Sequence, residues 1–119
     1  MIYLIPLFCY AQELTASWYS IESLHKDGQW NITKGVMSDG TKFSDSNLTC
    51  ATGLYALGTM LRITPIQRQA GKSAEVIVKV CDRIGKRFIK TRIDLSKAAF
   101  EQIADLKKGL IDVKIIIFK

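Results

Sequence analysis

The sequence is poor in the residues that bind metal ions. It has one histidine, His25, and its three cysteines form no Cys-x-x-Cys pair. Structural zinc sites need four Cys or His ligands at short spacings, so we expect no metal centre, and no other motif predicts a cofactor. His25 lies in a polar stretch without a partner nearby in sequence, and we interpret it as a solvated loop residue.

The chain also lacks an apolar run long enough to cross a membrane. Its first residues, MIYLIPLFCYAQ, are almost continuously apolar, but a membrane-spanning helix needs about 20 such residues. Cys9 and Ala11 place small residues before a cleavage point after Ala11, which is typical of a secretory signal peptide, although no cationic leader precedes them. We therefore expect residues 1–11 to be a signal-peptide remnant and 12–119 the mature domain. A buried first strand is the alternative.

The overall composition predicts one compact, basic domain. Hydrophobic residues make up 48% of 119 residues, which is enough for a core. Lysine and arginine number 17 against 11 acidic residues, a net charge of +6. Such a surface favours polyanions, namely nucleic acid, anionic lipid or an acidic cell-wall polymer, and the charge alone does not choose among them.

Short strands dominate the predicted structure. Apolar residues alternate with polar ones at several places, and we count about six short strands and one helix, a pattern typical of a closed or nearly closed barrel. The helix is predicted from Ser96, a good N-cap residue, to about Leu106, with Gly109 as its stop. The polar residues 22–33 are predicted to form a loop.

The segment from Val76 to Phe100 carries the strongest chemical signal. Val76, Val78, Val80 and Asp82 share one parity, so a regular strand would place Asp82 at the end of its inward face. A carboxyl group shielded there holds a proton more readily and can act as a general acid. The alternative is an acid that caps a turn or pairs with a nearby arginine.

Six blocks of the sequence, in this order, are similar to the RlpA-like (rare lipoprotein A) double-psi β-barrel family. They are residues 16–20 (ASWYS), 39–43 (DGTKF), 48–51 (LTCA), 57–64 (LGTMLRIT), 78–83 (VKVCDR) and 92–100 (RIDLSKAAF). The resemblance implies a mainly β, six-stranded double-psi barrel with one short covering helix. It also implies a secreted bacterial protein that acts on peptidoglycan, often as a lytic transglycosylase.

The resemblance assigns roles to individual residues. The catalytic acid of the family falls on Asp82, while Asp94 matches a second aspartate that is expected to be structural. The active-site histidine of the family is replaced by Thr52, which we expect to orient the substrate or Asp82 in its place. Cys50 and Cys81 adjoin blocks that meet at the groove of such barrels, so we predict a disulfide between them; two separate buried thiols are the alternative.

Aromatic and basic residues are the candidates for substrate binding. Trp18 and Tyr19 would stack on sugars, or one ring would lie in the core and the other at the surface. Arg83 and Arg87 would line the groove rim and attract acidic glycans, together with the cations Lys86, Lys90 and Arg92. A solvated basic loop is the alternative for these cations.

The predicted function is the cleavage of peptidoglycan glycan strands with a 1,6-anhydro product. A non-catalytic, expansin-like module that binds or loosens wall polysaccharide is the second interpretation. Nucleic-acid binding is disfavoured, because no recognised motif accompanies the basic charge. We expect a monomer without stable membrane insertion, located in the periplasm or cell envelope of a bacterium.

Overall fold

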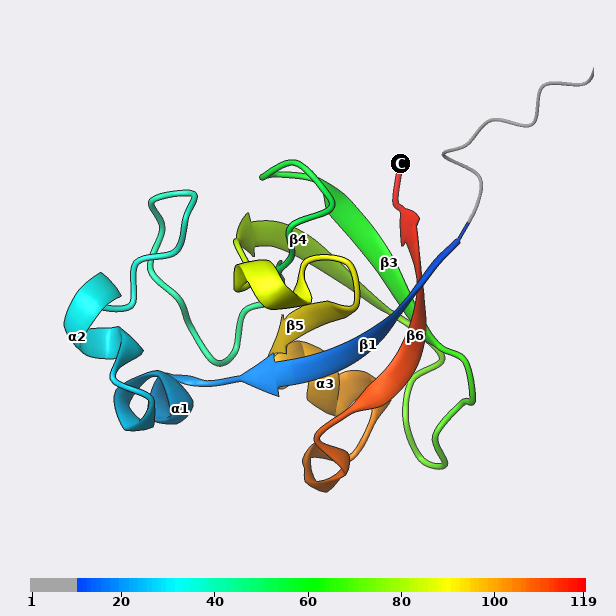
Figure 1. Ribbon diagram of the computed structural model, residues 1–119. Helices are drawn as coiled ribbons and strands as arrows, with labels where there is room; N and C mark the ends of the chain where they lie inside the picture. Colours follow the sequence, from blue (N-terminus) through cyan, green and yellow to red (C-terminus); the bar gives the residue numbers. More distant parts are fainter. Residues whose placement is uncertain (1–10) are drawn as a thin grey trace, which may run out of the picture.

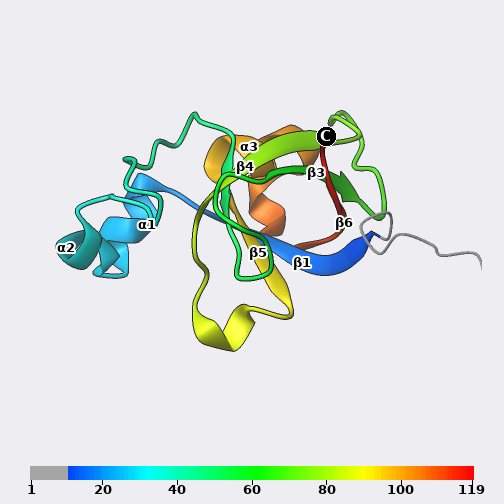
Figure 2. The same ribbon diagram turned by 90° about the horizontal axis from the view of Figure 1, so that it is seen from above.

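The computed structural model describes residues 11–119 and shows six strands closed into a barrel (Figure 1, Figure 2). The strands follow one another around the barrel in the order β1-β5-β2-β4-β3-β6. Pairs β1–β5 and β2–β4 are parallel, and the other pairs are antiparallel. The predicted six-stranded barrel is confirmed. The strands are β1 (Gln12–Tyr19), β2 (Thr49–Ala51), β3 (Met60–Pro65), β4 (Val76–Asp82), β5 (Arg92–Ser96) and β6 (Ile111–Ile117).

Alternating apolar residues fill the barrel. Val78, Leu61 and Ile115 have no exposed surface, while their strand neighbours Lys79, Arg62 and Lys114 are exposed. Each fully buried side chain of this size contributes about 1.5–3 kcal/mol relative to an exposed one. This period-two pattern explains why the strands, and hence the barrel, could be predicted from the sequence.

The helix α3 (Lys97–Ile103) packs against the barrel through Phe100 and Ile103. Ser96 is its N-cap, as predicted, and the hydroxyl accepts a hydrogen bond from Ala99 N at 3.3 Å. The helix ends before the predicted Leu106, because the backbone is extended at Ala104 (φ −158°). A separate 3-10 helix, η3 (Leu106–Lys108), follows.

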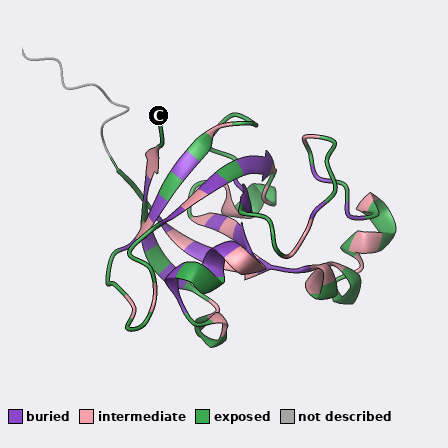
Figure 3. Ribbon diagram, turned by 180° about the vertical axis from the view of Figure 1, so that it is seen from behind, coloured by how far each residue is buried: buried purple, intermediate pink, exposed green. Residues whose placement is uncertain are grey.

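The prediction of a loop over residues 22–33 is wrong. Two short helices lie there, α1 (Ile21–Lys26) and α2 (Gln29–Thr33). Ser20 and Ser23 cap α1 reciprocally, with side-chain-to-backbone hydrogen bonds of 3.1 and 2.8 Å. Neither helix has a buried residue, and Figure 3 shows both as intermediate or exposed. His25 stacks on Trp30 with ring centroids 4.4 Å apart. We call residues 21–33 the helical arm.

Residues 1–10, nearly all of the predicted signal-peptide remnant, lie outside the described residues. Within residues 11–119, none of the helices has the length and apolar character that crossing a bilayer requires.

Candidate active site

A β-bulge at Cys81 decides where Asp82 points. On the parallel pair β2–β4, Cys50 lies opposite Val80, but the next residue, Ala51, lies opposite Asp82. Cys81 is therefore an extra residue without a partner on β2. Because of it, the side chains that follow on β4 point to the opposite face from the one their alternation predicts. Val80 belongs to the barrel core, whereas Cys81 and Ala51 belong to a second cluster. The prediction that Asp82 ends the inward face is wrong, and its carboxylate lies on the outer side of the barrel.

The strand register places Asp82 in a row with a second carboxylate. Ala51 pairs with Asp82 on one side and with Asp94 on the other, and Asp94 pairs with Ser17. Residues directly opposite in a sheet project from the same face, and adjacent strands lie about 4.8 Å apart. The two acids are thus two strand spacings apart, with only the small side chain of Ala51 between them.

Ala51, Asp82 and Asp94 line a pocket of about 380 Å³. The helical arm lines it through Ser23, Leu24, Asp27 and Gln29, and the segment from Arg83 to Gly85 also lines it. We call this the Asp82–Asp94 pocket. Its volume is in the range of small-molecule sites.

One oxygen of Asp82 is fully engaged. Oδ1 accepts hydrogen bonds from Ser38 N (3.1 Å), Ser38 Oγ (2.8 Å) and Arg83 N (2.9 Å). These three donors fix the orientation of the carboxylate, so its other oxygen is the one presented for interaction with a ligand.

Asp94 is the acidic residue of this pocket whose pKa is raised. The pKa of its carboxyl group is raised from 3.8 to about 6, mainly because the group is buried and to a smaller extent because of the negative charge of Asp82. A hydrogen bond from Ser17 Oγ (3.0 Å) and the charge of Arg92 act in the opposite direction. Asp94 was expected to be structural, but it lines the same pocket as Asp82 and binds a proton closer to neutral pH than an ordinary aspartate does.

The side chain of Thr52 does not line the Asp82–Asp94 pocket. Its side chain is completely buried, and its Oγ1 accepts a hydrogen bond from Leu54 N at 3.2 Å. Only its backbone meets Asp82, through Thr52 N and Asp82 O at 3.1 Å. The prediction that Thr52 orients the substrate or the carboxylate is therefore wrong; the hydroxyl closes a local turn.

Arg83 lines the pocket but is committed to the backbone. Its Nη1 donates to Thr52 O at 2.9 Å and to Tyr55 O at 2.6 Å. Arg87 is not among the residues that line the pocket. It lies over the Phe88 ring at 5.1 Å, and Arg92 lies over the same ring at 4.4 Å. The structure thus gives Arg83 a bracing role and places Arg87 on the outer part of the 83–91 loop.

Neither Trp18 nor Tyr19 forms the predicted sugar platform. Trp18 packs against the barrel core, and its Nε1 donates to Leu106 O at 3.0 Å. Tyr19 is buried and stacks on Phe43, with ring centroids 4.4 Å apart. Both residues belong to the strand β1, where successive side chains point to opposite faces. The Trp18 ring therefore packs on the barrel core, and the Tyr19 ring packs in the second cluster together with Met37.

The predicted disulfide is absent. Cys50 and Cys81 are both free and buried. Cys50 points into the barrel core, whereas Cys81 lies in the second cluster on the other face. The bulge that reorients Asp82 also separates the two thiols, although their strands are adjacent. Burial raises the pKa of the Cys81 thiol to about 11, so it is a poor nucleophile.

Ser17, Ser38 and the helical arm were not predicted from the sequence. Ser17 lies within the ASWYS block. Because it is next to Trp18 on a strand, its side chain points to the opposite face from the Trp18 ring, and this alternation could have predicted its outward position. The Ser20–Ser23 pair was the available signal for α1, since serines three residues apart can cap a helix. Ser38 is brought to Asp82 only by the tertiary fold, because 44 residues separate them.

The whole domain matches a known family. Residues 11–115 match the DPBB_1 family model, described as lytic transglycolase. The chain belongs to this family. The RlpA-like double-psi barrel expected from the sequence blocks is thereby shown. Uncharacterized protein ssl3177 of Synechocystis sp. is 38% identical over 79 residues, which are 66% of this chain and 78% of that protein.

Solved structures share the fold. A mutant of the Clavibacter michiganensis expansin in complex with cellohexaose has a TM-score of 0.62 and 20% identity, covering 92% of this chain and 51% of the expansin. The chain therefore spans about half the length of that protein. The Streptomyces papain inhibitor has a TM-score of 0.63 and 21% identity, covering 94% of this chain and 98% of the inhibitor.

Proposed function

We propose that the protein cleaves the glycan strands of peptidoglycan as a lytic transglycosylase. The observation that carries this proposal is the pairing of Asp94, with its raised pKa, and Asp82 in one pocket on a transglycolase-family barrel. Export to the periplasm or cell envelope is part of the proposal and accords with the signal-like residues 1–11.

Asp94 is the proposed general acid. Its proton passes to the oxygen that leaves when the bond between the MurNAc C1 and the GlcNAc oxygen breaks. The 6-hydroxyl of the same MurNAc then attacks C1, and its proton returns to Asp94. The product is a 1,6-anhydro ring, and the reaction consumes no water, so a second group to activate water is not required.

Asp82 remains a predicted catalytic residue with a different task. Its carboxylate is held by Ser38 and the Arg83 backbone, and it can stabilise the positive charge that develops at C1 in the transition state. Its charge also contributes to the raised pKa of Asp94, which increases the fraction of the general acid that holds a proton at a given pH.

The second candidate is a non-catalytic polysaccharide-binding module. The expansin complex with cellohexaose favours it, because that protein has the same fold. In this case the two carboxylates would hydrogen-bond sugar hydroxyls without cleaving the chain.

Incubation with purified peptidoglycan and mass analysis of the soluble products separates the two. Wild type is expected to release anhydro-muramyl products, and Asp94→Asn is expected to release them about 10²- to 10⁴-fold more slowly while it still sediments with the glycan. Binding by both proteins with no release by wild type would establish the expansin-like module instead.

A further inference from the structure

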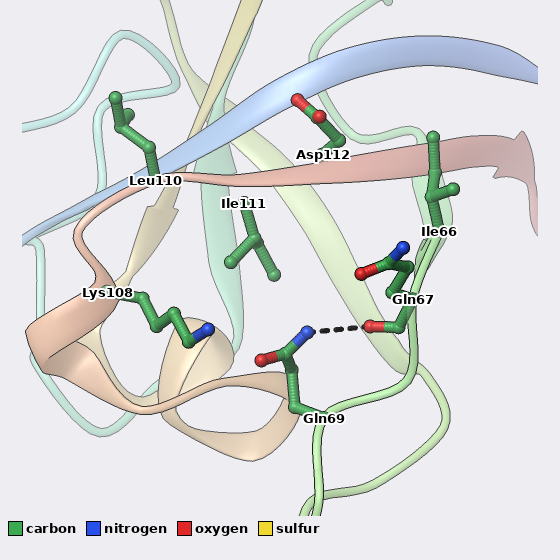
Figure 4. A pocket seen from close by; sticks show the side chains of 7 residues that line it. All are labelled: Ile66, Gln67, Gln69, Lys108, Leu110, Ile111 and Asp112. Carbon is green, nitrogen blue, oxygen red and sulfur yellow. Dashed lines mark hydrogen bonds between the residues drawn. The ribbon is translucent and has the colours of Figure 1, made fainter.

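Two adjoining hollows lie outside the Asp82–Asp94 pocket and have no role in the chemistry above. They measure about 360 and 300 Å³, and both are lined by Ile66 and Asp112. Figure 4 shows the second of them, with Ile111 pointing into the space between Lys108 and Gln69. Joined at Ile66 and Asp112, the hollows have the size of a ligand site.

The strand register connects these hollows to the active pocket. Thr15 and Ser17 are two residues apart on β1 and project from the same face. Thr15 pairs with Asp112 of β6, and Ser17 pairs with Asp94 of β5. A rise of two residues along the strand and two strand spacings across the sheet place the Cα atom of Asp112 roughly 12 Å from that of Asp94. A chain of a few sugar rings spans this distance.

The lining combines groups that suit sugar rings. Thr15 Oγ1 donates to Asp112 Oδ1 at 3.2 Å, which holds that carboxylate at the hollow with its second oxygen available. The Gln69 amide donates to Gln67 O at 2.7 Å, so its own oxygen is left as an acceptor. Ile66 is 44% exposed and offers an aliphatic surface beside these polar groups. Sugar hydroxyls both donate and accept hydrogen bonds, and sugar rings have apolar faces that pack on such a side chain.

We infer that the Ile66–Asp112 hollows are an accessory subsite for the uncleaved part of the glycan chain. This inference rests on the proposed function, since it extends the same substrate beyond the Asp82–Asp94 pocket. The protein then binds several consecutive sugars along the outer face of β1, and long chains are held more tightly than short ones.

The test measures the affinity for peptide-free glycan chains of increasing length by calorimetry. The Asp94→Asn protein serves as the parent, so that the chains stay intact. Ile66→Asn and the conservative Asp112→Asn are compared with Met60→Asn, which changes a 38% exposed residue at the other end of β3. Melting temperatures verify that each variant folds.

The parent should bind long chains about tenfold more tightly than short ones, and both hollow variants should lose this gain while their short-chain affinity is unchanged. Met60→Asn should retain the gain. Equal losses for short and long chains, or a gain that survives both hollow variants, would overturn the subsite alone. A gain that requires attached peptides would assign the hollows to peptide and also overturn it. No binding at any length would overturn the proposed function as well.

Discussion

The proton on Asp94 is controlled by its immediate neighbours. Ser17 Oγ donates to the carboxylate at 3.0 Å and lowers the pKa of Asp94. Ser17→Ala removes this donor, so the pKa should rise and the fall in product release at high pH should move to higher pH. Ser73→Ala changes an exposed serine that does not line the pocket, so it is the control and should leave the profile unchanged. A profile that moves to lower pH would show that the hydroxyl does not act on Asp94.

The same carboxyl group makes the stability of the fold depend on pH. The pKa of Asp94 is about 6 in the folded protein and near 3.8 when unfolded, so its contribution is fully present below about pH 4 and is lost as the pH rises through 6. Asp94→Asn should therefore exceed wild type in unfolding free energy by about 1–3 kcal/mol at pH 8, with little difference at pH 4. Urea melts at both pH values measure this. A constant difference would contradict the linkage.

At the scale of elements, the 83–91 loop, which lines the pocket through Arg83 to Gly85, is held in place by a close contact between Ile89 and Gly53. A Cβ added to Gly53 would lie 2.7 Å from Ile89 Cγ1 and 2.8 Å from Cγ2, which is closer than atoms pack. Gly53→Ala should push the 83–91 loop away, destabilise the fold by about 1–3 kcal/mol and slow product release. Thermal melts and product assays provide the measurements.

Gly85→Ala is the matched control for this contact. A Cβ at Gly85 meets only Phe88 Cδ2, at 3.9 Å, so this change should leave the melting temperature nearly unchanged. Truncation of Ile89 to alanine removes both clashing Cγ atoms and should recover part of the loss in the double variant. If Gly53→Ala behaves like Gly85→Ala, the two loops do not contact as described.

The elements that follow a simple period were predictable, whereas the irregular ones were not. The strands β3 and β6 alternate buried and exposed residues, and Ser96 begins a helix as its side chain predicts. The bulge at Cys81 does not alter the alternating pattern of the residues before it. It nevertheless turns the side chain of Asp82 to the outer face of the barrel. The polar helical arm has no buried residue, so it has no apolar stripe that a periodicity argument could detect.

The two acids could be predicted one at a time, but their pairing could not. Asp82 and Asp94 stand out in the family blocks, yet the row that links them passes through Ala51, which lies far from both in sequence. Burial, which is the main cause of the raised pKa of Asp94, arises from tertiary packing. Which carboxyl group keeps a proton is therefore a property of the assembled fold.

At the scale of the whole molecule, no covalent cross-link joins the strands within residues 11–119. Cys50 and Cys81 are free and face opposite sides of their strands. Reduction should leave the melting temperature unchanged, and alkylation after unfolding without reductant should modify both cysteines. Peptide mass analysis reports the modification. A melting temperature that falls by several degrees with reductant would indicate a disulfide in solution.

The raised pKa of Asp94 beside Asp82 is the basis of the proposed general-acid mechanism. NMR titration of the Asp94 carboxyl carbon in the intact protein measures this directly. We expect an apparent pKa of about 6 in wild type, and a lower value in Asp82→Asn, because the charge that raises it is removed. A value near 3.8 that does not respond to Asp82→Asn would contradict the proposed general acid.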